Sequence, residues 1–485
     1  MRLLLFSVLV AFPLVAHVGS PDIFYEGDAG PYHLLVTIRP PQVVPGVAEV
    51  EIRCASPYVR QVRILPLRLV RGRQFAPVPD LARPSREDPQ FYTGALWLMA
   101  TGSWQVRVDV QGDRGEGRLA VPVPAVATRV LGVQKTVGLV LLPLGLLLSV
   151  AFVSIAGAAA REATLEAGQS PSAADLRRGR IAMAAAALVL IGVLWLGKAW
   201  WNSEDGIYRR YVFKPLTLKP ALGGSRLLLH LEDPGWLNRR TDDLVPDHDH
   251  LMHLYVIRLP QMERVWHLHP SLDPDGDFMQ QLPPMPAGHY ALYGDIVHAN
   301  GLPETTTAEL DLPATAGQPL TGDDAGGAGP PLTQADYNRI VTPLSGGFRM
   351  VWERDAAPYR AGRPYRFRFR VEDASGRPAP DMELYMGMLG HAAFVKSDRS
   401  VFAHVHPSGS VPMQALALTE ASSSHASHGT MPGMPMPESG ALPAEVSFPY
   451  GFPQAGPYRI FVQVKRGGTI ETGMFDARVE PAGGK

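Results

Sequence analysis

Two long apolar segments constrain the fold of this chain more than any other feature. The first covers about residues 136–160 and contains no charged residue, and the second covers about residues 181–200, with Lys198 close to its end. Each reaches the roughly 20 apolar residues that a helix needs to cross a bilayer. Trp195, Trp200 and Trp201 are typical of the aromatic belt at a membrane surface. The sequence therefore predicts a two-helix transmembrane hairpin over residues 131–204.

The charges around these segments predict their orientation. The short connection between them is basic and contains Arg161, Arg177, Arg178 and Arg180. Short basic loops stay in the cytoplasm, so both flanking portions should face the periplasm. The N-terminus agrees, because Arg2 precedes an apolar run and the small residue Ala16, as in a signal peptide over residues 1–16. We therefore expect an inner-membrane protein whose two large portions are extracytoplasmic.

The portions outside the apolar segments are expected to be mainly β. The chain contains 46 prolines and 48 glycines, and residues 17–130 include six short alternating segments, among them YHLLVTIRP and WQVRVDVQG. Alternation of this kind, interrupted by turn residues, is typical of a β-sandwich. A net charge of −1 leaves no basic surface for nucleic acid. The single cysteine, Cys54, excludes an internal disulfide.

An internal repeat follows the second apolar segment. We expect two β-sandwich copies, over residues 205–313 and 335–485, separated by a glycine- and proline-rich linker at 314–334. The first copy contains MHLYVIRLPQMERVWHLHP and the second contains GHAAFVKSDRSVFAHVHP. The matching histidines are His253, His267 and His269 in the first copy and His391, His404 and His406 in the second.

The repeated histidines predict a metal site in each copy. One histidine begins a strand, and the returning strand carries the other two in a His-x-His-Pro motif. Residues two apart on a strand share a face, and cross-strand neighbours lie close enough to share one ion. Three imidazoles suit copper or zinc. The alternative is that these are ordinary polar or half-buried rings, copied together by duplication.

Further candidate ligands favour copper over zinc. His248 and His250 precede the first triad in an Asp-His-Asp-His run, and Met388 precedes the second triad. A Met- and His-rich loop, SSSHASHGTMPGMPMPESG, adds soft thioethers, which select Cu(I). Its candidate ligands are His425, His428, Met431, Met434 and Met436. The alternative is a low-complexity linker that happens to carry these residues.

Parts of the chain resemble a known group of domains. The N-terminal portion, with GPYHLLVTIRPPQVVPG and GSWQVRVDV, is similar to YtkA-like and FixH-like periplasmic domains. The second copy resembles the same group through PDMELYMGMLGHAAFVKSDRSVFAHVHPSG and FPQAGPYRIFVQV. The resemblance covers about 80 residues of each domain and implies immunoglobulin-like β-sandwiches, in a setting near copper handling or oxidase assembly. The first copy departs from it by adding histidines.

The leading hypothesis is a non-enzymatic, membrane-anchored metal-binding protein that captures or delivers copper, with zinc as the second choice. A protein partner such as an oxidase or a transporter would fit this role. The sequence contains no nucleophile-elbow, zinc-protease or nucleotide-binding motif. One alternative is a metal-free structural or assembly module of a respiratory membrane complex. Another is an oxidative copper enzyme, if cleavage after Ala16 exposes His17 as a chelating N-terminus, with His33 as a further ligand.

Overall fold

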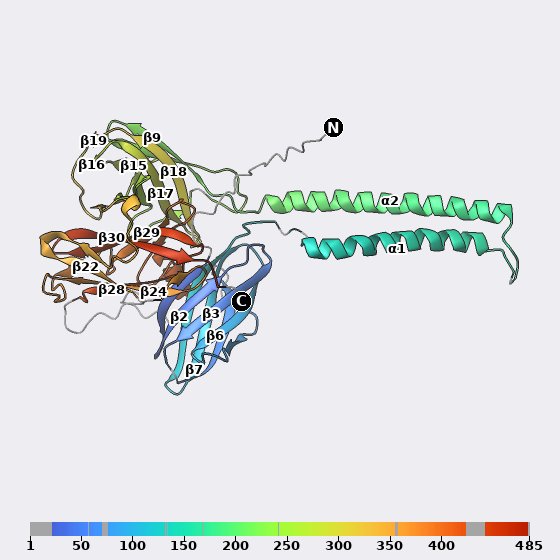
Figure 1. Ribbon diagram of the computed structural model, residues 1–485, viewed down its shortest axis with the longest axis horizontal. Coiled ribbons are helices and arrows are strands. Elements are labelled where there is room, and N and C mark those ends of the chain that lie inside the picture. The colour runs from blue at the N-terminus through green and yellow to red at the C-terminus, as the bar shows by residue number, and fades with distance from the viewer. Residues whose placement is uncertain are drawn as a thin grey trace, which may run out of the picture. The chain divides into compact units, whose positions relative to one another are not determined.

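The computed structural model is mainly β, with two long helices (Figure 1). It describes residues 22–483 apart from 57, 70–75, 131, 133, 167, 241, 355–356 and 423–441. The chain divides into two compact units: Met1–Val126 with Lys214–Lys485, and Ala127–Phe213. The expected signal peptide, residues 1–16, lies outside the described residues.

The helical unit consists of α1 (Lys135–Glu162) and α2 (Ala173–Arg209), which lie side by side (Figure 1). Both are long and apolar enough to cross a membrane, as the sequence predicted. Their closest approach is at Gly157 and Gly179, where an added Cβ on Gly179 would lie 3.0 Å from the Gly157 carbonyl oxygen. Small residues allow transmembrane helices to pack this closely. Ser172 and Asp175 form a capping box that begins α2.

The N-terminal domain is an eight-stranded sheet with the order β1-β2-β3-β6-β5-β4-β7-β8. The sequence predicted six of these strands and missed β1 and β5. β5 is short and mostly exposed, and β1 lacks strict alternation because part of it packs outside its own sheet. The strands are β1 (Ile23–Ala29), β2 (Tyr32–Arg39), β3 (Gly46–Cys54), β4 (Val59–Arg68), β5 (Asp80–Pro84), β6 (Phe91–Leu98), β7 (Gly102–Gly112) and β8 (Gly115–Ala125).

The first copy of the repeat is built on a ten-stranded sheet, in which β12 lies between β17 and β13. One face of β12 and β13 packs into a core formed by residues such as Leu254, Val256 and Leu268. The strands are β9 (Thr217–Gly223), β10 (Arg226–Glu232), β11 (Leu244–Val245), β12 (His253–Leu259), β13 (Arg264–Leu268), β14 (Ser271–Leu272), β15 (Phe278–Gln281), β16 (Pro284–Met285), β17 (Gly288–His298), β18 (Pro303–Leu312), β19 (Thr315–Ala316) and β20 (Ala325–Ala328).

The segment 314–334, expected as a linker, is instead part of the first copy. It forms β19, β20 and a 3-10 turn, η2 (Leu332–Gln334), and β20 pairs with β13. Its glycines are needed for close packing: a Cβ on Gly327 would lie 2.6 Å from Thr472, and one on Gly329 would lie 2.8 Å from the sulfur of Met474. The glycine-rich composition therefore reflects close contact between the two copies.

The second copy consists of a four-stranded and a six-stranded sheet that share one aromatic core. Trp352, Phe369 and Phe448 come from the smaller sheet, and Phe394 and Phe475 come from the larger one. The elements are β21 (Val341–Pro343), η3 (Ser345–Gly347), β22 (Arg349–Glu353), β23 (Tyr359–Arg360), β24 (Tyr365–Glu372), β25 (Met382–Glu383), β26 (His391–Lys396), β27 (Phe402–Val405), α3 (Met413–Ser422), β28 (Glu445–Tyr450), β29 (Gly456–Arg466) and β30 (Thr469–Glu480).

The two copies pack against each other through a separate apolar cluster. Tyr293 of β17 stacks on Phe402 of β27, with ring centroids 4.3 Å apart, and Tyr255 joins the same cluster. The buried Arg459, paired with Asp476, donates hydrogen bonds to two backbone carbonyls of the first copy. Because side chains alternate along a strand, β12 and β26 each face their own core on one side and the other copy on the other.

Candidate metal centre

Eight histidines converge where the facing strands of the two copies meet. His253, at the start of β12, lies on the same face as Tyr255, whose ring stacks on His267 at a centroid distance of 4.1 Å. Rings of the two copies are in contact, with 5.3 Å between the centroids of His253 and His404. We call this set the histidine cluster: His248, His250, His253, His267, His269, His391, His404 and His406.

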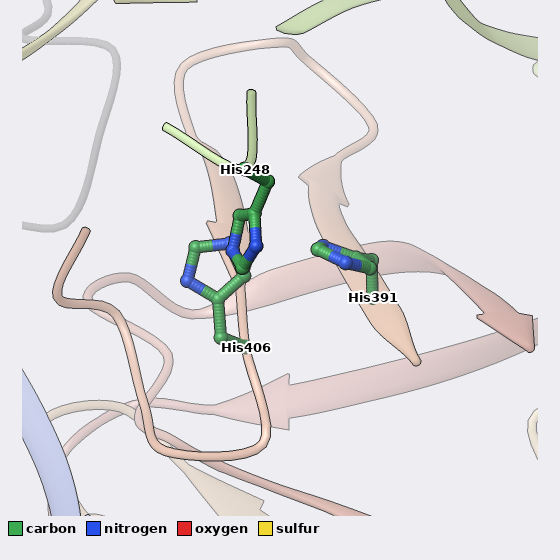
Figure 2. Close-up of side chains that lie close together, drawn as sticks. All are labelled: His248, His391 and His406. Atoms are coloured by element: carbon green, nitrogen blue, oxygen red, sulfur yellow. The ribbon is translucent and has the colours of Figure 1, made fainter. Parts of the chain in front are cut away.

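Within the histidine cluster, two groups of three residues could each hold a metal ion. His253, His267 and His269 form the first group, and His248, His391 and His406 form the second. In each group, one ring nitrogen per histidine lies within 4.8 Å of the others. Figure 2 shows the second group, in which His248 belongs to the first copy of the repeat. The sequence had expected His404 in that place, and in the structure His404 Nε2 lies 3.1 Å from His391 Nδ1.

Hydrogen bonds in the first copy determine which ring nitrogens are free. His253 Nε2 lies 3.0 Å from the carbonyl oxygen of Asp247, which only accepts, so Nε2 carries the proton and Nδ1 has a lone pair. His267 Nδ1 lies 2.9 Å from Gln463 Oε1, which leaves the lone pair on His267 Nε2. These two lone-pair nitrogens face each other at 3.1 Å. At this separation both nitrogens can bind the same cation.

The second copy reproduces the arrangement. His391 Nε2 lies 3.3 Å from the carbonyl oxygen of Tyr385, and His404 Nδ1 lies 3.4 Å from a carboxylate oxygen of Asp295. His391 Nδ1 and His404 Nε2 lie 3.1 Å apart, as the corresponding nitrogens of the first copy do. Such outer contacts orient the histidine ligands of metal sites.

Two of the residues that orient these rings, Asp295 and Gln463, each belong to one copy and contact a histidine of the other copy. Asp295 pairs with His253 across β17 and β12, and Gln463 pairs with His391 across β29 and β26. Each side chain, however, contacts a histidine of the other copy: Asp295 contacts His404 and Gln463 contacts His267. Sequence reasoning missed both residues, although their matched positions in the repeat could have indicated them.

Three further ring nitrogens are buried without a hydrogen-bond partner among the residues that the structure describes. They are the Nε2 atoms of His248, His269 and His406. The other nitrogen of His269 lies 3.1 Å from Asp324, and that of His406 lies 3.4 Å from the Val411 carbonyl oxygen. A buried polar atom without a partner costs about 1–3 kcal/mol. Metal coordination is the interaction that would satisfy all three.

Burial keeps five rings of the histidine cluster neutral, those of His253, His267, His391, His404 and His406. It lowers the pKa of His253, His267 and His391 well below the ordinary histidine value. Burial also lowers the pKa of His404 well below that value and the pKa of His406 to about 3. A proton shared between facing rings is therefore disfavoured near neutral pH. Neutral imidazole is the form that binds metals.

A tight turn in each copy carries further predicted ligands: His248 and His250 in the first copy and Met388 in the second. Asp247 and His250 close one turn, with positive φ at His248 and Asp249, and Tyr385 and Met388 close its counterpart, also with positive φ at both central residues. His250 thus corresponds to Met388. The ring of His250 stacks on His269 at a centroid distance of 4.0 Å, and Met388 is buried. The remaining candidates lie outside the described residues: His425, His428, Met431, Met434, Met436 and His17.

The N-terminal domain supports the turn that carries His406. The backbone N–H of Glu26 in β1 donates to the Ser408 carbonyl oxygen at 2.8 Å, and Ser410 N–H donates to the Phe24 carbonyl oxygen at 2.9 Å. The side chain of Phe24 is buried in the core of the second copy. The second ligand group is therefore assembled from three parts of the chain, and its position depends on residues almost 400 positions away.

A substitution at Gly409 tests whether the turn that carries His406 depends on its contact with β1. A Cβ at Gly409 would lie 1.9 Å from the Phe24 carbonyl oxygen, and its φ is +130°. We expect Gly409→Ala to lower the free energy of unfolding by more than about 2 kcal/mol and to weaken metal binding by the second group. Gly115→Ala is the matched control, because its φ is +106° and nothing lies within 4 Å. Equal melting temperatures of the two variants would show that β1 does not hold this turn.

Comparisons with known proteins add little to this geometry. Residues 345–481, which include His391, His404 and His406, match a family described as a domain of unknown function, DUF8832. No curated protein matches the chain.

Similarity to solved structures is low. The native conformation of E. coli alpha-2-macroglobulin is 10% identical, with 97% of this chain and 23% of that chain covered and a TM-score of 0.19. A protein from Corynebacterium diphtheriae described as membrane anchored is also 10% identical, with 96% of each chain covered and a TM-score of 0.16. The chain therefore spans less than a quarter of the macroglobulin, and similarities this low carry no argument about fold or function.

Proposed function

We propose that this protein is a non-enzymatic, membrane-anchored metal-binding protein that captures or delivers copper through the histidine cluster. The observation that carries the proposal is the pair of 3.1 Å contacts between ring nitrogens, one in each copy. In both pairs the opposite ring nitrogen is occupied by an oxygen acceptor. A metal cation between the rings would be coordinated by both nitrogens of a pair.

Copper fits this donor set better than zinc. Structural zinc sites usually combine cysteine with histidine, and the only cysteine, Cys54, is buried in the N-terminal domain. The described ligand groups contain only imidazoles, which suit copper and zinc alike. Methionine stands at the positions of the second copy that correspond to His248 and His250, and thioethers favour Cu(I).

The setting that we propose is the periplasmic side of the inner membrane. Support comes from the two apolar helices and from the basic connection between them. The resemblance to immunoglobulin-like periplasmic domains points to the same compartment and to a partner such as an oxidase or a transporter. Anchoring would confine copper exchange to the membrane surface.

Copper titration of the full chain in detergent tests the proposal. We expect tight binding of Cu(I) or Cu(II), and its loss when His253, His267, His269, His391, His404 and His406 are replaced together by alanine. His253→Gln with His391→Gln is a milder variant that should also lose most of the binding. The control replaces three exposed histidines outside the cluster, His33, His230 and His289, and should bind as the unchanged protein does.

Two outcomes would contradict the proposal. Equal copper binding in all variants would place binding outside the histidine cluster. Absence of copper binding by the unchanged chain would favour a metal-free assembly module instead.

A further inference from the structure

We infer that the histidine cluster is a single dinuclear centre, in which two copper ions bind together and cross-link the two copies of the repeat. This inference rests on the proposed function, because it concerns the same cluster. It adds the number of ions, their proximity and their effect on the contact between the copies.

The two ligand groups of the histidine cluster are separate. His253, His267 and His269 share no member with His248, His391 and His406. Each group has three donors, so each can hold an ion while the other is filled. His404 adds a further donor beside the second group, with its Nε2 3.1 Å from His391 Nδ1.

The two ligand groups are also neighbours. The ring of His248 lies 6.1 Å from that of His253, and the ring of His267 lies 6.2 Å from that of His391, measured between centroids. His404 lies between them, 5.4 Å from His267 and 5.3 Å from His391. Because rings of the two groups lie only 6.1 and 6.2 Å apart, two ions held by these groups would be close neighbours. Two Cu(II) spins at such a separation interact magnetically.

Acidic side chains lie beside both ligand groups and can compensate the charge of two ions. Asp324 contacts His269 of the first group, and Asp295 contacts His404 beside the second. Asp247 is buried next to both turn histidines and accepts a hydrogen bond from the Gln414 N–H of α3. An acidic side chain therefore contacts a histidine in the first group and a histidine beside the second group. Two neighbouring cations without such carboxylates would repel each other strongly in a buried site.

The second ligand group combines histidines of both copies. His248 of the first copy completes the group of the second, and its ring lies 5.1 Å from His391 and 4.9 Å from His406. An ion in the second group is therefore bonded to both copies. An ion in the first group reaches the second copy through His267, which is held by Gln463. Loss of the ions should loosen the contact between the copies.

The test compares copper stoichiometry and paramagnetic resonance in the full chain in detergent, with Cu(II) as the probe. The unchanged protein should bind two Cu(II) per chain, with reduced signal intensity and a half-field transition from coupled spins. His248→Asn should bind one Cu(II), with an uncoupled signal, and so should His269→Ala. Asparagine is chosen because His248 has a φ of 51°, which asparagine tolerates.

The outcomes separate this inference from the proposed function. His230→Ala, at an exposed histidine paired with Asp277, should keep two coupled ions. One Cu(II) per chain in the unchanged protein, or two without coupling, would overturn the dinuclear centre and leave copper binding intact. No bound Cu(II) or Cu(I) would overturn both. A variant that unfolds is replaced by His406→Gln for the second group or His253→Gln for the first.

Discussion

Copper at about 1,000 times its dissociation constant should raise the free energy of unfolding of the metal-free protein by about 4 kcal/mol for each ion bound. This gain should disappear when His253 and His391 are both replaced by leucine. The Nδ1 of each of these rings lies 3.1 Å from a ring nitrogen of a second histidine. The leucine variant lacks one nitrogen of each pair and therefore lacks the site.

The leucine variant should be at least as stable as the metal-free protein. The carbonyl oxygens of Asp247 and Tyr385 lose a histidine donor, but each still accepts the backbone N–H that closes its turn. Burial of an apolar side chain is favourable, and replacement of buried polar groups by apolar ones of similar volume is often neutral or stabilising. Functional sites commonly lower the stability of a protein, and here bound copper would offset that loss.

Thermal unfolding followed by circular dichroism, with copper and with a chelator, checks this prediction. His230→Leu is the control, since this exposed histidine lies outside the cluster, and it should keep the full rise with copper. If the leucine variant still gained stability from copper, the facing ring pairs would not be the site.

The metal-free protein should unfold steeply in mild acid. Burial lowers the pKa of the six repeat histidines, His253, His267, His269, His391, His404 and His406. In the unfolded chain these rings titrate near the ordinary value of about 6.5. Their folded pKa values are depressed, so their contribution to stability is present above about pH 6.5 and is lost as the pH falls below it.

The slope of this loss is large. Each proton taken up on unfolding changes the free energy of unfolding by about 1.4 kcal/mol per pH unit, so six rings contribute roughly 8 kcal/mol per unit once the unfolded chain is protonated. The pKa values of His33 and His289 are raised by their carboxylate partners and act in the opposite sense. Burial raises the pKa of Asp295 to about 7, which also offsets part of the slope.

Chemical denaturation at a series of pH values measures this slope. Bound copper should move the acid transition to lower pH, because protons must then displace the ion. The variant with leucine at His253 and His391 should have a shallower slope by about two protons. A stability that stays constant from pH 7 to pH 5 in the metal-free protein would show that the cluster is open to water.

Much of the architecture can be predicted from local patterns. The two apolar segments predicted α1 and α2, and alternating segments predicted the mainly β character, because both signals come from residues close together in the chain. Period-two spacing placed His267 and His269 on one face of a strand, where the structure brings them together with His253. The repeat itself indicated that a second set of histidines has equivalent positions.

What the sequence by itself determined is therefore the elements, the repeat and the pairing of histidines within each hairpin. Only the tertiary structure decided that both hairpins turn their histidines toward one contact, that His248 replaces His404 in the second group, and that Gly327 and Gly329 serve close packing. It also decided that Asp295 and Gln463 each orient a ring of the other copy. The physical reason is that a strand has two faces with equal periodicity, and which face meets the other copy depends on contacts between residues far apart in the chain.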